Sequence, residues 1–382
     1  MMKKHIFIFK KVATIFVVLI TILSMAIVPP AQACSRLVYQ GSSNGPITAR
    51  SMDWFQDPDA KLWFFPKGMK RDGGAGTNSI TWTSKYASII TSSYDIATVD
   101  GINEKGLVAN LLFLEATDYG DIEPTEKTLS LGGWGQYVLD NYATVEEAVQ
   151  GLESKPFQLA TATFDQLVSA GLISPLPLPL QAALGGLEFA LHLSLSDPSG
   201  DSAIFEYIDG ELTIHHDKEY NVLTNDPIFD QQLALSTYWD QVGAGSFLPG
   251  TNNPSDRFVR ASYYLHKMNE QLITKVKKDR RNELAAALGI IRNVSDPLGL
   301  ASFSLGTTQW RTVADQNNIN PAYFFEYTKS PNLFWVVMNN LNLEEGAEVM
   351  SLEDLTALSL VGEVSQQFQK TDPFSWDISS TL

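Results

Sequence analysis

The fold is decided by two runs of sequence, CSRLVYQ at residues 34–40 and ITARSMDW at residues 47–54. Both runs are rich in residues that favour strands, and the run between them, GSSNGP at residues 41–46, consists of turn-forming residues. Two such runs around such a turn predict a β-hairpin. A turn centred on Ser43 pairs Cys34 with Met52 in antiparallel register, so residues 50–53 should lie beside Cys34.

The residues before Cys34 have the pattern of a secretory signal. A basic start with four lysines and no acid precedes an uncharged apolar run at residues 12–28, two prolines, and the triplet Ala31-Gln32-Ala33. This is an A-x-A cleavage site. The alternative is an uncleaved membrane anchor, because the apolar run is near the lower limit for spanning a bilayer. We expect residues 1–33 to be a signal peptide, and residues 34–382 to form one exported domain, periplasmic or secreted, without stable membrane association.

Cys34 is the only cysteine in the chain, so it has no partner for an intrachain disulfide. Exported proteins normally use cysteines in pairs, and an unpaired cysteine at a predicted cleavage site indicates a function. It could be acylated, as in lipoproteins, or it could be a catalytic nucleophile at the new N-terminus. Ala31 stands where most lipoprotein signals have leucine, which favours the nucleophile and leaves lipidation as the alternative.

Further patterns alternate in groups along the chain. Helices are predicted at residues 132–142, 145–152 with Thr144 as N-cap, 255–267 and 281–292, and strands at residues 86–94, 106–114, 191–196, 202–208, 211–214, 310–313, 322–327 and 332–338. Grouped elements favour stacked layers over a doubly wound parallel sheet. The apolar segment 157–190 could be a helical hairpin over the core or a flap beside a pocket.

Charge and histidine spacing exclude two classes of partner. Without the leader, four of the 27 basic residues are lost, so 23 remain against 43 acidic ones and the formal charge moves from −16 to −20. Such a surface repels phosphate backbones, which excludes nucleic acid. No histidines have the spacing of a zinc motif, and we expect no metal.

An N-terminal cysteine carries a nucleophile and a base in one residue. Its α-amine titrates near ~8, so a useful fraction is neutral at physiological pH. The amine can take the thiol proton and later give it to a leaving amine. Signal cleavage would therefore also activate the enzyme.

Four motifs follow Cys34 in chain order: ARSMDW at residues 49–54, DGINEKGL at 100–107, LTNDPIFD at 223–230 and SDRF at 255–258. Together with the N-terminal cysteine, they resemble the choloylglycine hydrolases, which include bile salt hydrolases and penicillin V acylases. The resemblance covers essentially the whole chain after residue 33.

The resemblance implies roles for three residues of the hairpin. Cys34 would be the nucleophile, Arg50 a fixed cation that lowers the pKa of its sulfur, and Asp53 the carboxylate that orients the α-amine. Residues three apart in a regular strand face opposite sides. Both Arg50 and Asp53 can therefore address Cys34 only if the strand ends or bulges near Ser51–Met52.

Three further site residues are implied. The side-chain N–H of Asn225 would donate to the oxyanion of the tetrahedral intermediate, although a Thr-Asn-Asp-Pro sequence is also a good turn. Phe113 would give a backbone N–H as the second donor, with its side chain in the pocket wall. Arg257 would pair with an active-site carboxylate; a surface charge at a helix end is the alternative.

The resemblance also implies the fold class and the reaction. The fold would be an α+β, four-layer αββα sandwich of two antiparallel sheets between helical layers. The reaction would be hydrolysis of a small-molecule linear amide without cofactors. The pattern is most similar to penicillin V acylase-like members of Gram-negative bacteria, which often accept N-acyl-homoserine lactones. The alternatives are a conjugated bile salt hydrolase and a lipid-anchored, non-catalytic binding protein of the same fold; a homo-oligomer is compatible with each.

Overall fold

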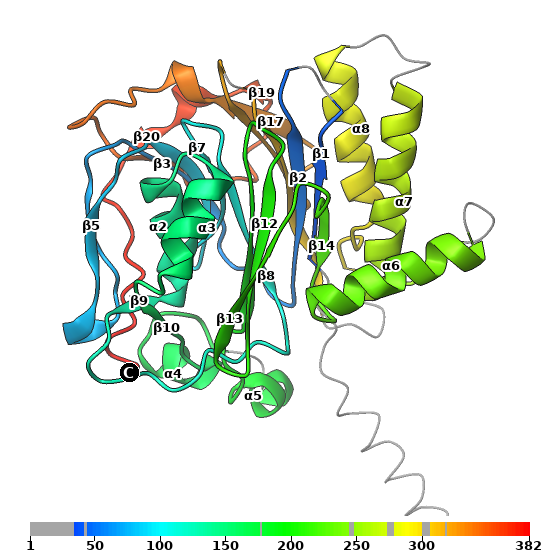
Figure 1. The fold of residues 1–382 in the computed structure, drawn as a ribbon. Helices are drawn as coiled ribbons and strands as arrows, with labels where there is room; N and C mark the ends of the chain where they lie inside the picture. The colour runs from blue at the N-terminus through cyan, green and yellow to red at the C-terminus, as the bar shows by residue number, and fades with distance from the viewer. Residues whose placement is uncertain are drawn as a thin grey trace, which may run out of the picture.

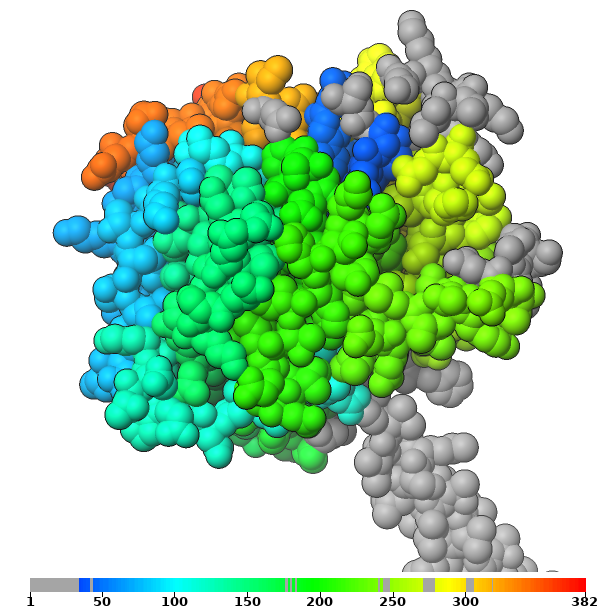
Figure 2. All heavy atoms as spheres, viewed as in Figure 1, coloured from blue at the N-terminus to red at the C-terminus, as the bar shows by residue number. Residues whose placement is uncertain are grey.

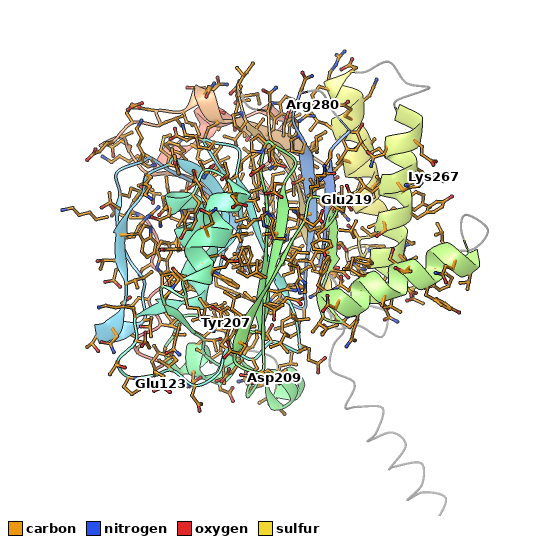
Figure 3. All side chains as sticks on the ribbon, in the orientation of Figure 1. Glu123, Tyr207, Asp209, Glu219, Lys267 and Arg280 are labelled. Carbon is orange, nitrogen blue, oxygen red and sulfur yellow. The ribbon has the colours of Figure 1, made fainter. Side chains whose placement is uncertain are left out.

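Two large β-sheets lie face to face, and helices cover their outer faces (Figure 1). The computed structural model describes residues 34–41, 44–175, 178–243, 248–272, 279–299, 306–317 and 319–382. The layers follow the order helix, sheet, sheet, helix, so the expected αββα sandwich is confirmed. Side chains fill the space between the layers (Figure 3).

The first sheet has seven strands, and the hairpin predicted from the sequence lies inside it. In spatial order its strands are β14 (Val222–Thr224), β1 (Ser35–Tyr39), β2 (Ile47–Trp54), β15 (Thr307–Asp315), β16 (Ala322–Tyr327), β17 (Leu333–Val337) and β19 (Gly362–Glu363). All neighbours are antiparallel except the short β17–β19 pair.

The second sheet has nine strands and is antiparallel throughout. In spatial order they are β13 (Glu211–His216), β12 (Ser202–Ile208), β11 (Leu191–Ser196), β8 (Val108–Phe113), β7 (Ala97–Asn103), β6 (Ser88–Ser93), β3 (Lys61–Phe65), β18 (Met350–Leu352) and β20 (Gln369–Lys370). The sequence patterns missed β7, because Asp100-Gly101 interrupts it. Glycine is needed there, since a Cβ at Gly101 would lie 2.6 Å from Ile90 Cγ2.

Two helical layers cover the sandwich. Helices α2 (Trp134–Asn141) and α3 (Val145–Glu153) pack on the second sheet, and α7 (Pro254–Leu272) and α8 (Arg280–Asn293) pack on the first. As predicted, Thr144 caps α3, because its hydroxyl accepts a hydrogen bond from the Glu147 N–H at 3.2 Å. On α7 the buried side chains follow helical spacing, at Phe258, Ala261, Leu265 and Met268. Helix α6 (Phe229–Gly243) leads from β14 toward α7, and both lie on one side of the molecule (Figure 2).

In its described residues, the apolar segment 157–190 combines a short strand with two short helices, rather than forming a helical hairpin alone. It holds β10 (Gln158–Ala160), which pairs in parallel with β9 (Thr128–Ser130), and two short helices, α4 (Phe164–Ser169) and α5 (Leu178–Leu184). A further small pair joins β4 (Lys70–Asp72) to β5 (Thr81–Thr83).

The predicted signal peptide, residues 1–33, lies outside the described residues. Among the residues that the structure does describe, no helix has the length and apolar character needed to cross a bilayer.

Candidate active site

Cys34 lies at the N-terminal end of β1, between two neighbouring strands, and only 3% of its surface is exposed. Ser35 pairs with Ser51 on β2 and with Thr224 on β14, so one residue earlier Cys34 falls between Met52 and Asn225. This is the register that the turn spacing predicted for the hairpin. Cross-strand neighbours have their side chains on the same face of a sheet. Residues 34, 52 and 225 therefore share one face.

This shared face is the one between the two sheets. Arg36 and Arg50 pair across the hairpin on the same face, and both guanidinium groups reach backbone carbonyls of the second sheet. Arg36 donates to the Leu195 carbonyl at 2.9 Å, and Arg50 donates to the Leu111 carbonyl at 2.6 Å. Alternation along the strands then places Cys34 and Met52 in the space between the sheets.

Arg50 is fully enclosed beside the sulfur. Its guanidinium pairs with Asp100 at 3.4 Å and is held by carbonyls of β7 and β8. Burial raises the pKa of the Cys34 thiol above its ordinary value, and the positive charge of Arg50 is the largest influence that lowers it. The backbone N–H groups of Asp53, at 3.4 Å from the sulfur, and of Phe113 act in the same direction as Arg50.

Asp53 faces the opposite side of the sheet, toward the helical layer. Its carboxylate accepts a hydrogen bond from the Thr308 hydroxyl at 2.5 Å and pairs with Arg257 at 2.5 Å. The condition stated for this strand, an end or a bulge near Ser51–Met52, is not met, because β2 continues unbroken to Trp54. The irregularity lies in β15 instead, where the register shifts between Thr308 and Trp310. Asp53 contacts the sulfur through its backbone N–H, while its carboxylate lies on the other face.

Arg257 is buried between the first sheet and its helices, so it is not a surface charge at a helix end. It pairs with Asp53 and, at 2.6 Å, with Asp296, and it donates to the carbonyls of Asn252 and Val294 at 2.9 and 2.8 Å. The expected ion pair with a carboxylate is therefore present. Sequence reasoning missed Asp296 and Thr308, because neither lies in a recognisable motif.

Asn225 follows β14 and is completely buried. Neither its amide nitrogen nor its amide oxygen has a hydrogen-bond partner among the residues that the structure describes. A turn asparagine normally uses its side chain to bond the nearby backbone. Here Gln232 bonds that backbone, at the carbonyls of Thr224, Asn225 and Pro227. The side chain of Asn225 is therefore not used to hold the turn.

A buried carboxylate that no sequence motif indicated, that of Glu206, holds the start of α6. The Glu206 carboxylate accepts hydrogen bonds from the Phe229 N–H at 3.1 Å and contacts His192 at 3.0 Å and His215 at 3.3 Å. Although burial opposes it, the contacts with the two histidines lower the pKa of Glu206 to about 2. Glu206 is therefore an anionic anchor for the segment that carries Asn225.

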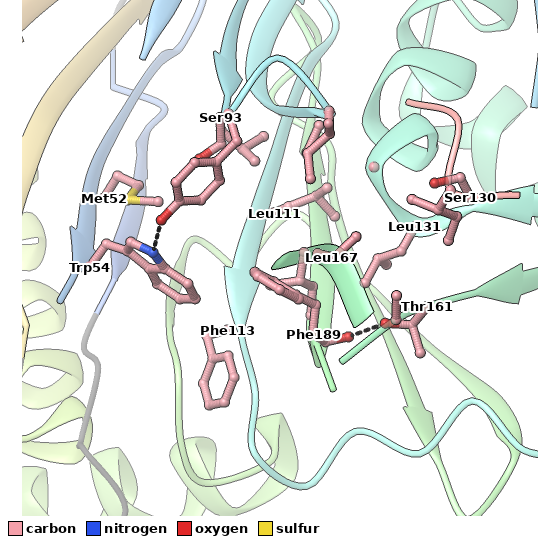
Figure 4. Close-up of a pocket in the computed structure, with 18 of the residues that line it drawn as sticks. Met52, Trp54, Ser93, Leu111, Phe113, Ser130, Leu131, Thr161, Leu167 and Phe189 are labelled. Carbon is pink, nitrogen blue, oxygen red and sulfur yellow. Dashed lines mark hydrogen bonds between the residues drawn. The ribbon is translucent and has the colours of Figure 1, made fainter. Parts of the chain in front are cut away.

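An apolar cavity with an empty volume of about 760 Å³ adjoins Cys34 between the sheets (Figure 4). Aromatic and aliphatic side chains form most of its wall, among them Met52, Trp54, Leu111, Phe113, Leu131 and Phe189. The Trp54 indole N–H donates to the Tyr94 hydroxyl at 2.7 Å, which fixes the ring at the wall (Figure 4).

The segment 157–190 contributes to this wall. Residues 160–162, Leu167 and Phe189 line the cavity, and Phe189 stacks on Phe164 with ring centroids 4.6 Å apart. The position of this segment beside a pocket, which was part of the second alternative, is confirmed. A second hollow shares Trp54, Phe113 and Phe189 with the cavity and adds Glu115 and Glu188.

The site residues do not form a metal site. Within the described part of the chain, one group of side chains has ligand-compatible spacing, Glu146, Asp201 and His216, and it includes none of the residues around Cys34.

Comparison with known proteins identifies the family. The model of the linear amide C–N hydrolases, choloylglycine hydrolase family, matches residues 34–357. The chain belongs to this family. Choloylglycine hydrolases act on linear amide C–N bonds, so the chain is a hydrolase of this class, and the matched region begins at Cys34.

Two relatives are similar over nearly their whole length. A penicillin V acylase of Pectobacterium atrosepticum is 44% identical over 366 residues, which cover 90% of this chain and 92% of the relative. The solved structure of penicillin V acylase from Agrobacterium tumefaciens is 43% identical, with a TM-score of 0.77 over 90% of this chain and 99% of that one. A mutant of the conjugated bile acid hydrolase from Clostridium perfringens has a TM-score of 0.66 at 20% identity, over 86% of this chain and 98% of that one, and shares the fold.

Proposed function

We propose that this choloylglycine hydrolase family member is a penicillin V acylase-type enzyme that uses Cys34 as its nucleophile. The observation that carries the proposal is the aromatic cavity directly beside Cys34, in a chain 44% identical to a penicillin V acylase. A phenoxyacetyl group is flat and apolar, and such a wall would hold it against the sulfur.

The reaction starts at the mature N-terminus. Signal cleavage after Ala33 during export would free the α-amine of Cys34, which takes the thiol proton as the sulfur attacks the amide carbonyl carbon. Arg50 favours the thiolate by its charge, against the effect of burial. The Asp53–Arg257 pair, on the outer face of the same strand, provides a fixed carboxylate to orient the amine.

The tetrahedral intermediate carries its negative charge on the former carbonyl oxygen. The backbone N–H of Phe113, which lies beside the sulfur, and the amide N–H of Asn225, the neighbour of Cys34 in the register with β14, would donate to this oxygen. The intermediate collapses when the C–N bond breaks and the leaving nitrogen takes the proton from the α-amine. Water then attacks the thioester, which releases the carboxylic acid and restores the thiol.

We also propose that the enzyme is exported and is soluble after signal cleavage. This proposal rests on the leader pattern and on the A-x-A triplet directly before Cys34. A lipid-anchored protein that binds ligands without catalysis would instead carry a diacylglyceryl adduct on Cys34. Intact-mass measurement separates the two, since the proposal requires a chain that begins at an unmodified Cys34.

Release assays on this mature chain test the substrate. Penicillin V, N-acyl-homoserine lactones, and glycine- or taurine-conjugated bile salts are compared at equal concentration, with Cys34→Ser as the control. We expect the highest kcat/KM with penicillin V. A preference for bile salts would support the alternative hydrolase, and the absence of release from all three classes would refute the proposed function.

A further inference from the structure

We propose that Gln232 is a positioning residue that aligns the oxyanion donor Asn225, an inference that rests on the proposed function. The starting point is that the Asn225 side chain is buried and has no hydrogen bond to any residue that the structure describes. Its own amide therefore does not fix its direction. The position of the donor must come from the backbone that carries it.

Besides the pairing of β14 with β1, one side chain holds that backbone. The Gln232 amide nitrogen donates to the carbonyl oxygens of Thr224, Asn225 and Pro227 at 3.1, 3.0 and 2.6 Å. Its amide oxygen accepts from the backbone N–H of Thr224 at 3.1 Å and from the Thr224 hydroxyl at 3.2 Å. Within the described part of the chain, all five hydrogen bonds of the Gln232 side chain go to residues 224–227, and the side chain is fully buried.

Gln232 can serve as a fixed reference because the helix behind it is anchored. It lies in the first turn of α6, whose first residue, Phe229, donates its N–H to the buried carboxylate of Glu206. The Glu206 anchor also contacts His192 and His215, which belong to the second sheet. The Asn225 backbone is thus tied through Gln232 and α6 to the opposite side of the cavity.

Loss of Gln232 should affect the transition state more than substrate binding. The cavity wall does not include Gln232, so binding of the acyl group should change little. A hydrogen bond to the oxyanion depends strongly on distance and direction, so a small shift of Asn225 weakens it.

A double-mutant cycle with Gln232→Met and Asn225→Ala tests this role, with Gln231→Met as the control at an exposed neighbouring position. With penicillin V, we expect Gln232→Met to lower kcat about 10- to 100-fold with KM within about twofold. In the Asn225→Ala background the same change should lower kcat less than about threefold, because the donor is already absent. An equal loss in both backgrounds would overturn the proposal, since it would show a structural role that is independent of Asn225.

A probe that needs no turnover separates this inference from the proposed substrate. Phenoxyacetate, the acid that hydrolysis would release, binds without turnover and places a carboxylate oxygen where the oxyanion would form. Its Kd should rise about tenfold or more in Gln232→Met and in Asn225→Ala, and stay unchanged in Gln231→Met. An unchanged Kd in Gln232→Met alone would refute the positioning role, whereas failure to hydrolyse penicillin V would refute only the proposed function.

Gln232→Glu provides a second variant if Gln232→Met does not fold. A carboxylate keeps the acceptor for the Thr224 N–H but faces three carbonyl oxygens, whereas the protonated acid can donate to one of them. The kcat of this variant relative to the wild type should therefore recover as the pH is lowered. A ratio that stays constant with pH would contradict the proposal.

Discussion

Replacement of Asn225 by alanine should lower activity strongly while leaving the fold as stable as before. The amide of Asn225 is buried without a hydrogen bond to a described residue, so the substitution removes no such bond. A buried polar group without a partner costs about 1–3 kcal/mol, and its removal offsets the packing lost with the side chain. We expect the free energy of unfolding to stay within about 1 kcal/mol of wild type.

The catalytic effect of the same substitution should be large. Loss of one oxyanion donor typically lowers kcat by about 10²–10³, which corresponds to about 2.7–4 kcal/mol of transition-state stabilisation. Asn225→Ala should therefore lower kcat strongly while the free energy of unfolding stays nearly unchanged. A turn residue would show the reverse pattern, with lower stability and nearly normal kcat.

Asn103 offers a matched control, since it is an equally buried asparagine whose amide is fully used. Its nitrogen donates to the carbonyls of Leu139 and Tyr142 at 2.9 and 2.8 Å, and its oxygen accepts from the N–H groups of Lys105 and Leu107 at 3.0 and 3.1 Å. At about 1 kcal/mol for each bond, Asn103→Ala should lower the free energy of unfolding by about 3–5 kcal/mol.

Urea unfolding followed by tryptophan fluorescence, together with penicillin V hydrolysis, measures both quantities for the two variants. A loss of more than about 2 kcal/mol of stability in Asn225→Ala, or a kcat that remains within about threefold of wild type, would refute the assignment of Asn225 as an oxyanion donor.

Three further predictions concern the nucleophile and its surroundings. One uncleaved residue added before Cys34 keeps the thiol but converts the base into an amide, so hydrolysis should nearly vanish; full activity in a homogeneous extended chain would exclude the α-amine as the base. Arg50→Met should raise the pKa of the Cys34 thiol further, because the positive charge beside the sulfur is lost. The rate of Cys34 alkylation by iodoacetamide, measured against pH, should then rise at a higher pH than in the wild type. An unshifted pH–rate profile would contradict the role of Arg50. Burial, followed by the charge of Glu115, raises the pKa of Asp226 to about 6, so the folded state binds more protons than the unfolded state between about pH 4 and 6. The free energy of unfolding of the wild type should therefore fall as pH rises through this window. In urea titrations at pH 4.5 and 7, Asp226→Asn should make this fall about 1–2 kcal/mol smaller. An identical pH dependence in the two proteins would refute the raised pKa of Asp226.

The sequence by itself determined the hairpin and its register. The six turn residues lie between two runs with strand character, so the two strands pair symmetrically about the centre of the turn. Because side chains alternate between the two faces of a strand, this pairing also fixes which residues share a face with Cys34. The capped helix after Thr144 and the amphipathic helix with Arg257 were predictable for the same reason, because their signals lie within a few residues of each other.

The tertiary structure alone decided how the site is supported. Asp53 is 204 residues from Arg257 and 255 from Thr308, and no local pattern connects them. The sequence raised the question of how Arg50 and Asp53 could both address Cys34; in the folded chain Arg50 lies on the face of the sulfur, whereas Asp53 reaches the sulfur through its backbone N–H. Gln232 is only seven residues from Asn225, yet it looks like any other helix position until α6 is seen folded against β14. Local periodicity specifies which face a side chain occupies, whereas the groups it meets there depend on packing between elements that are remote in the chain.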